Sequence, residues 1–359
     1  MKVAIITRST LYTAPGGDTV QAVQTARHLA DMGVAAEIKL SNEVIDYQQY
    51  DLLHFFNLIR PADILYHSKH AGKPFVVSTI LVNYSEFDQH HRKGFGAALF
   101  SFLPSDKIEY LKTIARWLLG KDHLASLDYT WKGQRKSILE ILKKAAMILP
   151  NSVSEYQRIA QTYPSKVKYR VIPNGVNPHL FQRDFSVKKD AKLVLCVARI
   201  EGIKNQLNLI KALNNTQFNL LLIGSHAPNQ KGYYDECRSI AASNIRFIDH
   251  IPQDELVKYY QQAKVHILPS WFETTGLSSI EAAVMGCNIV ITDKGDAGEY
   301  FGNNAFYCDP GEPKSILSAV ERASHNRYNE NLHQMILKRY TWKQAAIQTL
   351  KAYQQTAIV

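Results

Sequence analysis

The sequence has few of the features that would place it in a membrane or in an oxidising compartment. Its 359 residues include only four cysteines, all in the second half and none close to another: Cys196, Cys237, Cys287 and Cys308. Such a set does not form a disulfide framework, so we expect reduced thiols and a cytosolic protein. No apolar run approaches the roughly 20 residues that span a bilayer. The opening residues MKVAIIT are typical of a first β-strand rather than of a signal peptide.

Common motifs of metal and cofactor chemistry are also missing. The 13 histidines are scattered without metal-ligand spacing, and no Asp-x-Asp pair is present to hold a metal on a diphosphate. The glycine loop near the N-terminus is neither Gly-x-Gly-x-x-Gly nor a P-loop. These absences argue against a standard dinucleotide enzyme, and we expect neither a cofactor nor a metal.

Length and composition indicate a globular protein of about two domains, with 46% hydrophobic and 21% charged residues. The net charge of +10 is uneven, because residues 1–178 carry 22 basic and 15 acidic groups while the remainder carries 20 and 17. Residues 92–144 alone hold 11 basic and 5 acidic groups. This local excess suits an anionic membrane surface, a phosphorylated acceptor or nucleic acid, and equally an ordinary solvated face.

The most informative stretch runs from His266 to Thr292, HILPSWFETTGLSSIEAAVMGCNIVIT. An apolar run that stops at a proline, then a polar loop, predicts a strand followed by a turn. A helix is expected from Gly276 through Met285, with Gly286 as its left-handed terminator. The last five residues read as the next strand, so the stretch predicts a strand–loop–helix–strand unit.

This unit has a chemical interpretation. The N–H groups of Thr275, Gly276 and Leu277 are expected to point out of a helix start, where they favour an anion. Glu273 before the helix and Glu281 within it can bind hydroxyls on either side of a phosphate. That arrangement suits a nucleotide sugar, with Glu273 towards the sugar and Glu281 towards the ribose. A buried βαβ unit with two solvated glutamates remains the alternative at this point.

Several motifs, taken in order, resemble one family. ETTGLSSIE followed by AAVMGCNIV resembles the E-x7-E signature of retaining glycosyltransferases of family 4, which have the two-domain GT-B fold. VIPNGVN at 171–177 is similar to the family's I-P-N-G-V-N segment, and ARIEGIKNQ at 198–206 to its G-R-x-x-x-x-K-G motif. DHIPQDEL at 249–256 resembles the loop whose backbone pairs with the nucleotide base, and GDAGE at 295–299 the glycine loop beside the sugar.

The resemblance implies a donor site and roles for its residues. Arg199 and Lys204 would hold the diphosphate, and pre-placed cations favour a leaving group that gains negative charge. With Glu273 they form the expected catalytic set. The expected donor-binding residues are Arg199, Lys204, His250, Ile251, Glu273, Thr274, Thr275, Gly276, Leu277 and Glu281.

The residues expected on the acceptor side match the resembled family less completely than those on the donor side. In the resembled family a Gly-Gly loop lies at the cleft, which here implies Gly16 and Gly17, although a simple turn is an alternative interpretation. The histidine that many members carry after the strand equivalent to 75–79 is absent. Asn83, Tyr84 or a nearby acidic residue would replace it, or the donor phosphate itself would deprotonate the acceptor.

The expected architecture is α/β, with two doubly wound Rossmann-like domains facing each other across a cleft. We place the acceptor-side domain at 1–178 and the nucleotide-sugar domain at 179–342, with a linker at about 178–190. By resemblance, a final helix at 343–359 packs back on the first domain. The implied reaction is retaining transfer of a hexose-type sugar from a UDP- or GDP-linked donor to a glycan or lipid-linked acceptor. The implied setting is bacterial cell-surface polysaccharide synthesis.

Residues 92–121 raise the question of a membrane. A helix expected at 107–120 carries an apolar face flanked by lysine and arginine, which suits peripheral contact with an anionic bilayer. An ordinary helix packed on its own domain is the alternative. Rival functions are a sugar-nucleotide epimerase or phosphorylase on the same fold, a basic nucleic-acid-binding protein, and a non-catalytic homologue. The protein has no known nucleic-acid-binding motif, so we expect no nucleic-acid partner.

Overall fold

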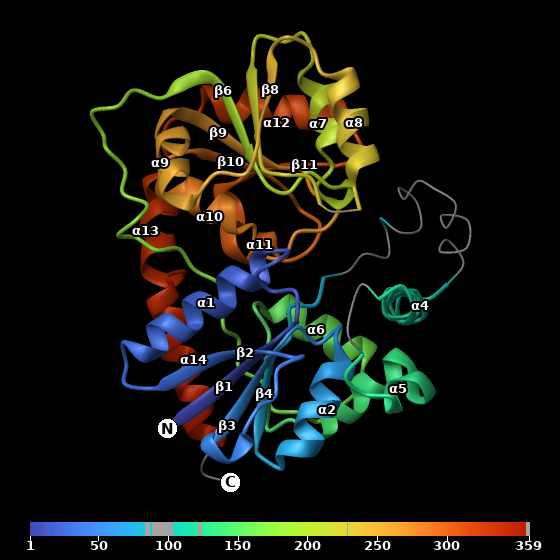
Figure 1. The fold of residues 1–359 in the computed structure, drawn as a ribbon. Coiled ribbons are helices and arrows are strands. Elements are labelled where there is room, and N and C mark those ends of the chain that lie inside the picture. Colours follow the sequence, from blue (N-terminus) through green and yellow to red (C-terminus); the bar gives the residue numbers. More distant parts are fainter. Residues whose placement is uncertain (83–86, 88–102, 121–123, 228, 357–359) are drawn as a thin grey trace. The chain divides into compact units, whose positions relative to one another are not determined.

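The chain divides into two compact units. The computed structural model describes residues 1–82, 87, 103–120, 124–227 and 229–356 (Figure 1). The first unit is formed by residues 1–81, 103–120, 124–174 and 342–356, and the second chiefly by residues 175–341. The first unit is therefore assembled from segments that lie on both sides of the second in the sequence.

The first unit is built on a five-stranded parallel sheet with the order β2-β1-β3-β4-β5. This is a doubly wound order, in which the connecting helices cover both faces of the sheet. The strands are β1 (Lys2–Thr7), β2 (Ala35–Leu40), β3 (Leu52–Phe56), β4 (Phe75–Ser78) and β5 (Met147–Leu149). The helices are α1 (Gly17–Ala30), α2 (Pro61–Ala71), α4 (Ser105–Leu118), α5 (Asp128–Lys144), α6 (Val153–Thr162) and α14 (Trp342–Thr356).

Helix α14 belongs to the first unit although it follows the second in the sequence. It packs on α1, and its Tyr353 is fully buried. The Tyr353 hydroxyl lies 2.7 Å from Nδ1 of His54 on β3, and Nε2 of the same ring lies 2.8 Å from Oγ of Ser78. Burial lowers the pKa of His54 to about 3, so the imidazole is neutral and links the helix to the sheet.

The second unit is built on a six-stranded parallel sheet with the order β11-β10-β9-β6-β7-β8. The strands are β6 (Asp190–Val197), β7 (Asn219–Ile223), β8 (Ile245–Ile248), β9 (Ala263–Leu268), β10 (Asn288–Thr292) and β11 (Phe306–Cys308). The helices are α7 (Gln206–Leu213), α8 (Lys231–Ile240), α9 (Gln253–Gln262), α10 (Leu277–Val284), α11 (Ala297–Phe301), α12 (Pro313–His325) and α13 (Glu330–Arg339), with a short 3-10 turn η3 (Gly202–Lys204) before α7.

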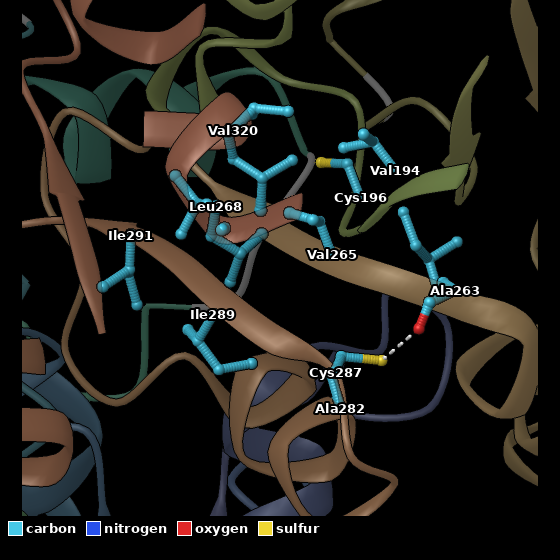
Figure 2. Close-up of a cluster of buried hydrophobic side chains, with 14 of the residues drawn as sticks. Val194, Cys196, Ala263, Val265, Leu268, Ala282, Cys287, Ile289, Ile291 and Val320 are labelled. Carbon is cyan, nitrogen blue, oxygen red and sulfur yellow. Dashed lines mark hydrogen bonds between the residues drawn. The ribbon is translucent and has the colours of Figure 1, made fainter. Parts of the chain in front are cut away.

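The core of the second unit explains why its central strands are almost continuously apolar. Helices cover both faces of the sheet, so side chains pointing either way are buried. Figure 2 shows side chains of β6, β9, β10, α10 and α12 gathered in one cluster, with Val265 and Ile289 among them. The Cys287 thiol donates a 3.2 Å hydrogen bond to the Ala263 carbonyl. All four cysteines are free and buried, as core thiols.

Some local expectations differ from the structure. The sequence predicts a helix at 19–32, whereas helix α1 begins at Gly17, with Gly16 as its N-cap. Ser152 with Glu155 three residues later predicts an N-cap for the helix that follows. Ser152 does cap α6, since its hydroxyl accepts a hydrogen bond from the Glu155 N–H, but the Glu155 side chain does not return to the Ser152 N–H. Its carboxylate is buried and accepts hydrogen bonds from the Asn151 N–H and the Thr79 hydroxyl. Helices α2, α9 and α13 had no counterpart in the sequence interpretation. Within the described ranges, no helix has the length and apolar character needed to cross a bilayer.

Candidate functional site

The sheet of the second unit has a topological switch point beside β6. From β6 the chain proceeds through β7 and β8 on one side, then returns to β9 and β10 on the other. In open α/β sheets, ligands bind outside the carboxyl ends of the strands at such a point. The segments leaving β6 and β9 there carry Arg199, Lys204 and Glu273. The topology therefore brings three of the residues expected to bind the sugar donor to the carboxyl ends of the central strands, which form one edge of the sheet.

An ion pair lies at this edge. Nζ of Lys204 is 2.7 Å from Oε2 of Glu273. The Ser270 hydroxyl donates to the same oxygen at 2.9 Å, and the Gly276 N–H donates to Oε1 at 3.2 Å. Glu273 is only 5% exposed, so three donors satisfy a carboxylate that is almost removed from water. The pair couples the loop after β9 to the turn after β6.

Asn205 sets the position of Lys204. It adopts a left-handed conformation with φ of 58°. The sequence predicts a helix at 205–213, whereas α7 begins at Gln206 and Asn205 is its N-cap. Its side-chain amide donates to the Pro269 carbonyl at 3.0 Å and the Pro310 carbonyl at 2.7 Å. Asparagine tolerates this conformation better than most residues. Sequence reasoning missed this role, and the asparagine directly after the motif lysine was the available signal.

A second backbone contact supports Glu273. The Glu273 N–H donates to the Lys294 carbonyl at 3.1 Å, and the Asp296 N–H donates to the Glu273 carbonyl at 2.8 Å. Gly295 lies between these two partners with φ of +104°. A Cβ at Gly295 would come within 2.2 Å of the Glu273 carbonyl oxygen. The glycine loop after β10 therefore holds the Glu273 backbone by close approach, which only glycine permits.

Glu281 is held apart from this pair, on helix α10. Its two carboxylate oxygens accept hydrogen bonds from the Gln253 amide at 2.8 Å and the Tyr260 hydroxyl at 3.0 Å. Burial raises the pKa of Glu281 to about 7, although these two hydrogen bonds oppose the shift. Gln253 and Tyr260 lie on α9, which sequence reasoning did not predict, so their role was missed. The alternative of two solvated glutamates is wrong, since both carboxylates are buried.

The expectation of three outward N–H groups at the start of α10 needs correction. The Gly276 N–H is already engaged by Glu273. Gly276 is the N-cap of α10, with φ of 68°, and Thr275 is only 1% exposed. Leu277 is the first helical residue, and Leu277 and Thr274 are half-buried. Fewer backbone N–H groups are therefore free to bind an anion at this turn than the sequence predicted.

The remaining donor-side candidates lie along the same sheet edge. The Arg199 side chain is 46% exposed and forms a 3.0 Å ion pair with Glu201. His250 is exposed and Ile251 half-buried, and both follow β8, the edge strand that β7 separates from β6. Among the described residues, no hydrogen bond or ion pair joins His250 or Ile251 to the Lys204–Glu273 pair.

The acceptor-side candidates belong to the first unit. Gly16 caps α1 with an ordinary extended backbone, φ of −153°, and Gly17 is the first helical residue. Arg8 holds the loop through a 2.6 Å ion pair with Asp18. Asn83 and Tyr84 lie outside the described residues, as do positions 92–102 and 121 of the expected membrane segment.

Within the described part of the chain, no group of three or more histidine, cysteine, aspartate or glutamate side chains is placed to hold a metal ion.

Comparison with known proteins gives the class of the second unit. Residues 180–342 match the family described as Glycosyl transferases group 1. An uncharacterized glycosyltransferase of Methanocaldococcus jannaschii is 26% identical over 209 residues, which are 52% of this chain and 54% of that protein. Residues 180–342 are therefore a group 1 glycosyltransferase domain. The chain spans about half the length of the first curated relatives that it matches.

Solved structures give the fold of the whole chain. The sucrose-phosphate synthase of Thermosynechococcus elongatus has a TM-score of 0.75 at 16% identity, covering 99% of this chain and 98% of its own. Anabaena HepE in complex with UDP and glucose has a TM-score of 0.71 at 15% identity, covering 99% of both chains. The fold is therefore GT-B, with two parallel sheets of Rossmann-like type, as expected from the sequence.

Proposed function

We propose that the protein is a retaining glycosyltransferase of family 4, with Glu273 and Glu281 as its E-x7-E pair. It would transfer a hexose-type sugar from a UDP- or GDP-linked donor to a glycan or lipid-linked acceptor. The observation that carries this proposal is the Lys204–Glu273 ion pair of 2.7 Å at the switch point of a group 1 glycosyltransferase domain. The structural neighbour in complex with UDP and glucose supports a nucleotide-sugar donor.

The chemistry follows from the charges at this edge. As the bond from the sugar to the diphosphate breaks, the departing oxygen gains negative charge. Lys204 and Arg199 would stabilise that charge, and stabilisation that grows in the transition state accelerates the reaction. Glu273 would then release Lys204 to the diphosphate and accept hydrogen bonds from sugar hydroxyls. The acceptor hydroxyl attacks from the same face, and its proton passes to the leaving phosphate oxygen. No enzyme nucleophile is needed.

Glu281 would bind the ribose hydroxyls, and its raised pKa makes donor binding depend on pH. An ionised carboxylate accepts stronger hydrogen bonds than a protonated one. Because burial raises the pKa of Glu281 to about 7, most of its ionised form is lost when the pH falls from 8 to 6. We expect nucleoside diphosphate affinity to fall by about tenfold, or about 1.4 kcal/mol, over that range.

Thermal stabilisation by UDP, GDP, ADP, TDP and CDP, measured at pH 8 and pH 6, tests both points. One base should give a clear shift in melting temperature at pH 8, and a smaller shift at pH 6. Glu281→Gln is the matched variant, because the diphosphate still titrates while residue 281 cannot. It should bind weakly at both pH values. No shift with any nucleotide would contradict the proposed donor, and an equal pH dependence in the variant would contradict the role of Glu281.

We further propose that the enzyme works at the cytoplasmic face of a membrane, on an acceptor for bacterial cell-surface polysaccharide. Support comes from the C-terminal part of helix α4, where Leu118 is 71% and Leu119 68% exposed and Trp117 is also exposed. Lys107 and Arg116 on the same helix are exposed as well. Apolar side chains flanked by cations suit the boundary of an anionic bilayer.

Vesicle co-sedimentation tests this contact. The protein should pellet with vesicles that contain phosphatidylglycerol and much less with phosphatidylcholine alone. Leu118→Ser with Leu119→Ser should reduce the pelleted fraction several-fold, because apolar burial contributes to interfacial binding. Val44→Ser is the control, since Val44 is a fully exposed apolar residue elsewhere in the first unit. Pelleting that is absent, or unchanged by the α4 substitutions, would contradict the membrane proposal.

The alternatives receive less support. Epimerisation or phosphorolysis on the same fold is not favoured, because the matched relatives carry the names of glycosyltransferases and synthases. Nucleic-acid binding has only the positive charge in its favour.

A further inference from the structure

A cavity lies at the amino ends of the strands in the sheet of the second unit, opposite the carboxyl ends where Lys204 and Glu273 lie. It has a volume of about 510 Å³ and is lined by residues 183, 185–189, 191 and 324–328, together with Lys264 and Gly286. Lys189 precedes β6, Lys264 lies near the start of β9, and Gly286 precedes β10. Arg199 follows the carboxyl end of β6. Because β6 has eight residues, its amino and carboxyl ends lie roughly 26 Å apart. The cavity is therefore separate from the proposed donor site.

The wall of this cavity is strongly basic. Its charged side chains are Arg183, Lys188, Lys189, Lys264 and Arg327, with His325 beside them, and no carboxylate lines it. None of the five cations forms an ion pair within the described part of the chain. Lys189 is balanced by main-chain dipoles, because its Nζ donates to the carbonyls of Tyr260 and Ala263 at 2.7 and 3.0 Å. The other four charges lack such compensation.

Arg183 is fixed in this wall without a carboxylate. Its guanidinium carbon lies 4.4 Å from the ring centre of Phe185 and 4.1 Å from that of Tyr328. The Gly286 backbone makes room for it, since a Cβ there would come within 2.6 Å of Nη1. Nε and Nη1 are buried without a hydrogen-bond acceptor in the described structure. The Arg183 guanidinium is thus held by two aromatic rings and by the space beside Gly286, without a carboxylate to neutralise its charge.

The cations also act on each other. The pKa of Lys264 is lowered, first by burial and then by the charge of Arg183. The pKa of Lys189 is lowered by burial too, and the charge of Arg183 adds to that shift. Repulsion of this kind raises the free energy of the empty cavity, and an anion bound among the cations would relieve it.

We propose that this cavity binds an organic phosphate, a small molecule with at least two negative charges on a phosphate monoester or diphosphate. Arginine and lysine are the side chains that recognise phosphate oxygens. A volume of about 510 Å³ lies within the range of small-molecule sites and exceeds the needs of a single inorganic ion. Phe185, 66% exposed, supplies an apolar wall for the organic part. The site goes beyond the proposed transfer reaction and does not depend on it.

Isothermal titration of the full-length protein with inorganic pyrophosphate tests the charge recognition. The background carries Arg199→Ala and Lys204→Ala, so that the proposed donor site does not contribute. We expect one remaining site, weakened at least tenfold by Lys188→Gln with Arg327→Gln. Both residues are exposed, so the fold should be unaffected. Lys192→Gln with Lys211→Gln removes the same charge from exposed positions of the same unit and should leave binding unchanged.

Lipid headgroups offer the same phosphate chemistry, so vesicles containing phosphatidic acid form a second arm. Suppose that the protein binds these vesicles but not pyrophosphate, and loses vesicle binding only when it carries Lys188→Gln with Arg327→Gln. The bound phosphate would then belong to a lipid headgroup, and the small-molecule ligand would be overturned. Binding of pyrophosphate alone supports the proposal. Binding of neither, or equal weakening by the control substitutions, overturns the site.

Discussion

Replacing Lys204 by alanine should lower kcat/KM for the nucleotide-sugar donor by about 10²–10³-fold, because the proposed mechanism then loses one of the two cations that would stabilise the departing diphosphate. The lysine also neutralises Glu273, which is 5% exposed and 2.7 Å away. Lys204→Ala therefore also leaves a buried carboxylate with fewer donors, and a loss of stability of about 1–3 kcal/mol is expected. Release of nucleoside diphosphate from the donor measures turnover, and urea unfolding measures stability.

The two effects can be separated by a second substitution. Lys204→Met with Glu273→Gln removes both charges together, so stability should recover while turnover stays low. Lys211→Ala, an exposed lysine on α7, is the matched control and should behave as wild type. Turnover by Lys204→Ala at the wild-type rate would show that Lys204 does not act on the diphosphate. Recovery of turnover in the double variant would instead assign the ion pair a structural role.

Replacing Gly295 by alanine should be similarly damaging, although Gly295 is not expected to touch the substrate. Its φ of +104° strains any other residue, and the added Cβ would lie 2.2 Å from the Glu273 carbonyl oxygen. The loop that carries Glu273 must then move. A displacement of about 1 Å at a positioned group costs about 10²-fold in turnover. We also expect a stability loss of about 2–4 kcal/mol, visible as a lower melting temperature.

Gly298→Ala is the control for this substitution. Gly298 lies three residues further on, in α11, and a Cβ there would meet no heavy atom within 4 Å. It should retain both turnover and melting temperature. If Gly295→Ala behaves like Gly298→Ala, then close backbone approach at residue 295 does not hold the Glu273 loop in place.

The local order of strands and helices was largely predictable, because it depends on short-range patterns. The stretch around Glu273 predicted a strand ending before Pro269 and a left-handed Gly286, and the structure has both. The helix predicted from Gly276 through Met285 is also present, although it spans Leu277–Val284 with Gly276 as its N-cap. Alternating strands and helices indicated an α/β protein, and the resemblance to the glycosyltransferase family implied its two-sheet GT-B fold. Lys204 and Glu273 were both candidates, but no sequence pattern showed that they touch.

The rest depends on contacts between distant residues. The Gln253 and Tyr260 side chains reach Glu281 only because α9 packs beside α10 in the folded unit. Burial in the folded unit raises the pKa of Glu281, and these two hydrogen bonds only partly offset that shift; no pattern of neighbouring residues in the sequence reveals the burial. Asn205 likewise acquires its role from two proline carbonyls, 64 and 105 residues away. Capping of α6 was predicted, yet Glu155 is drawn to Thr79, a partner 76 residues distant.

The helix α14 of the first unit is synthesised only after the whole second unit. Tyr353 on α14 is fully buried and hydrogen-bonded to His54 on β3. During synthesis the ribosome must therefore produce all of residues 175–341 before His54 can meet this partner. Domains generally fold as units while the chain grows. The second unit can thus reach its native state while the first still lacks α14 and exposes the apolar surface that this helix covers.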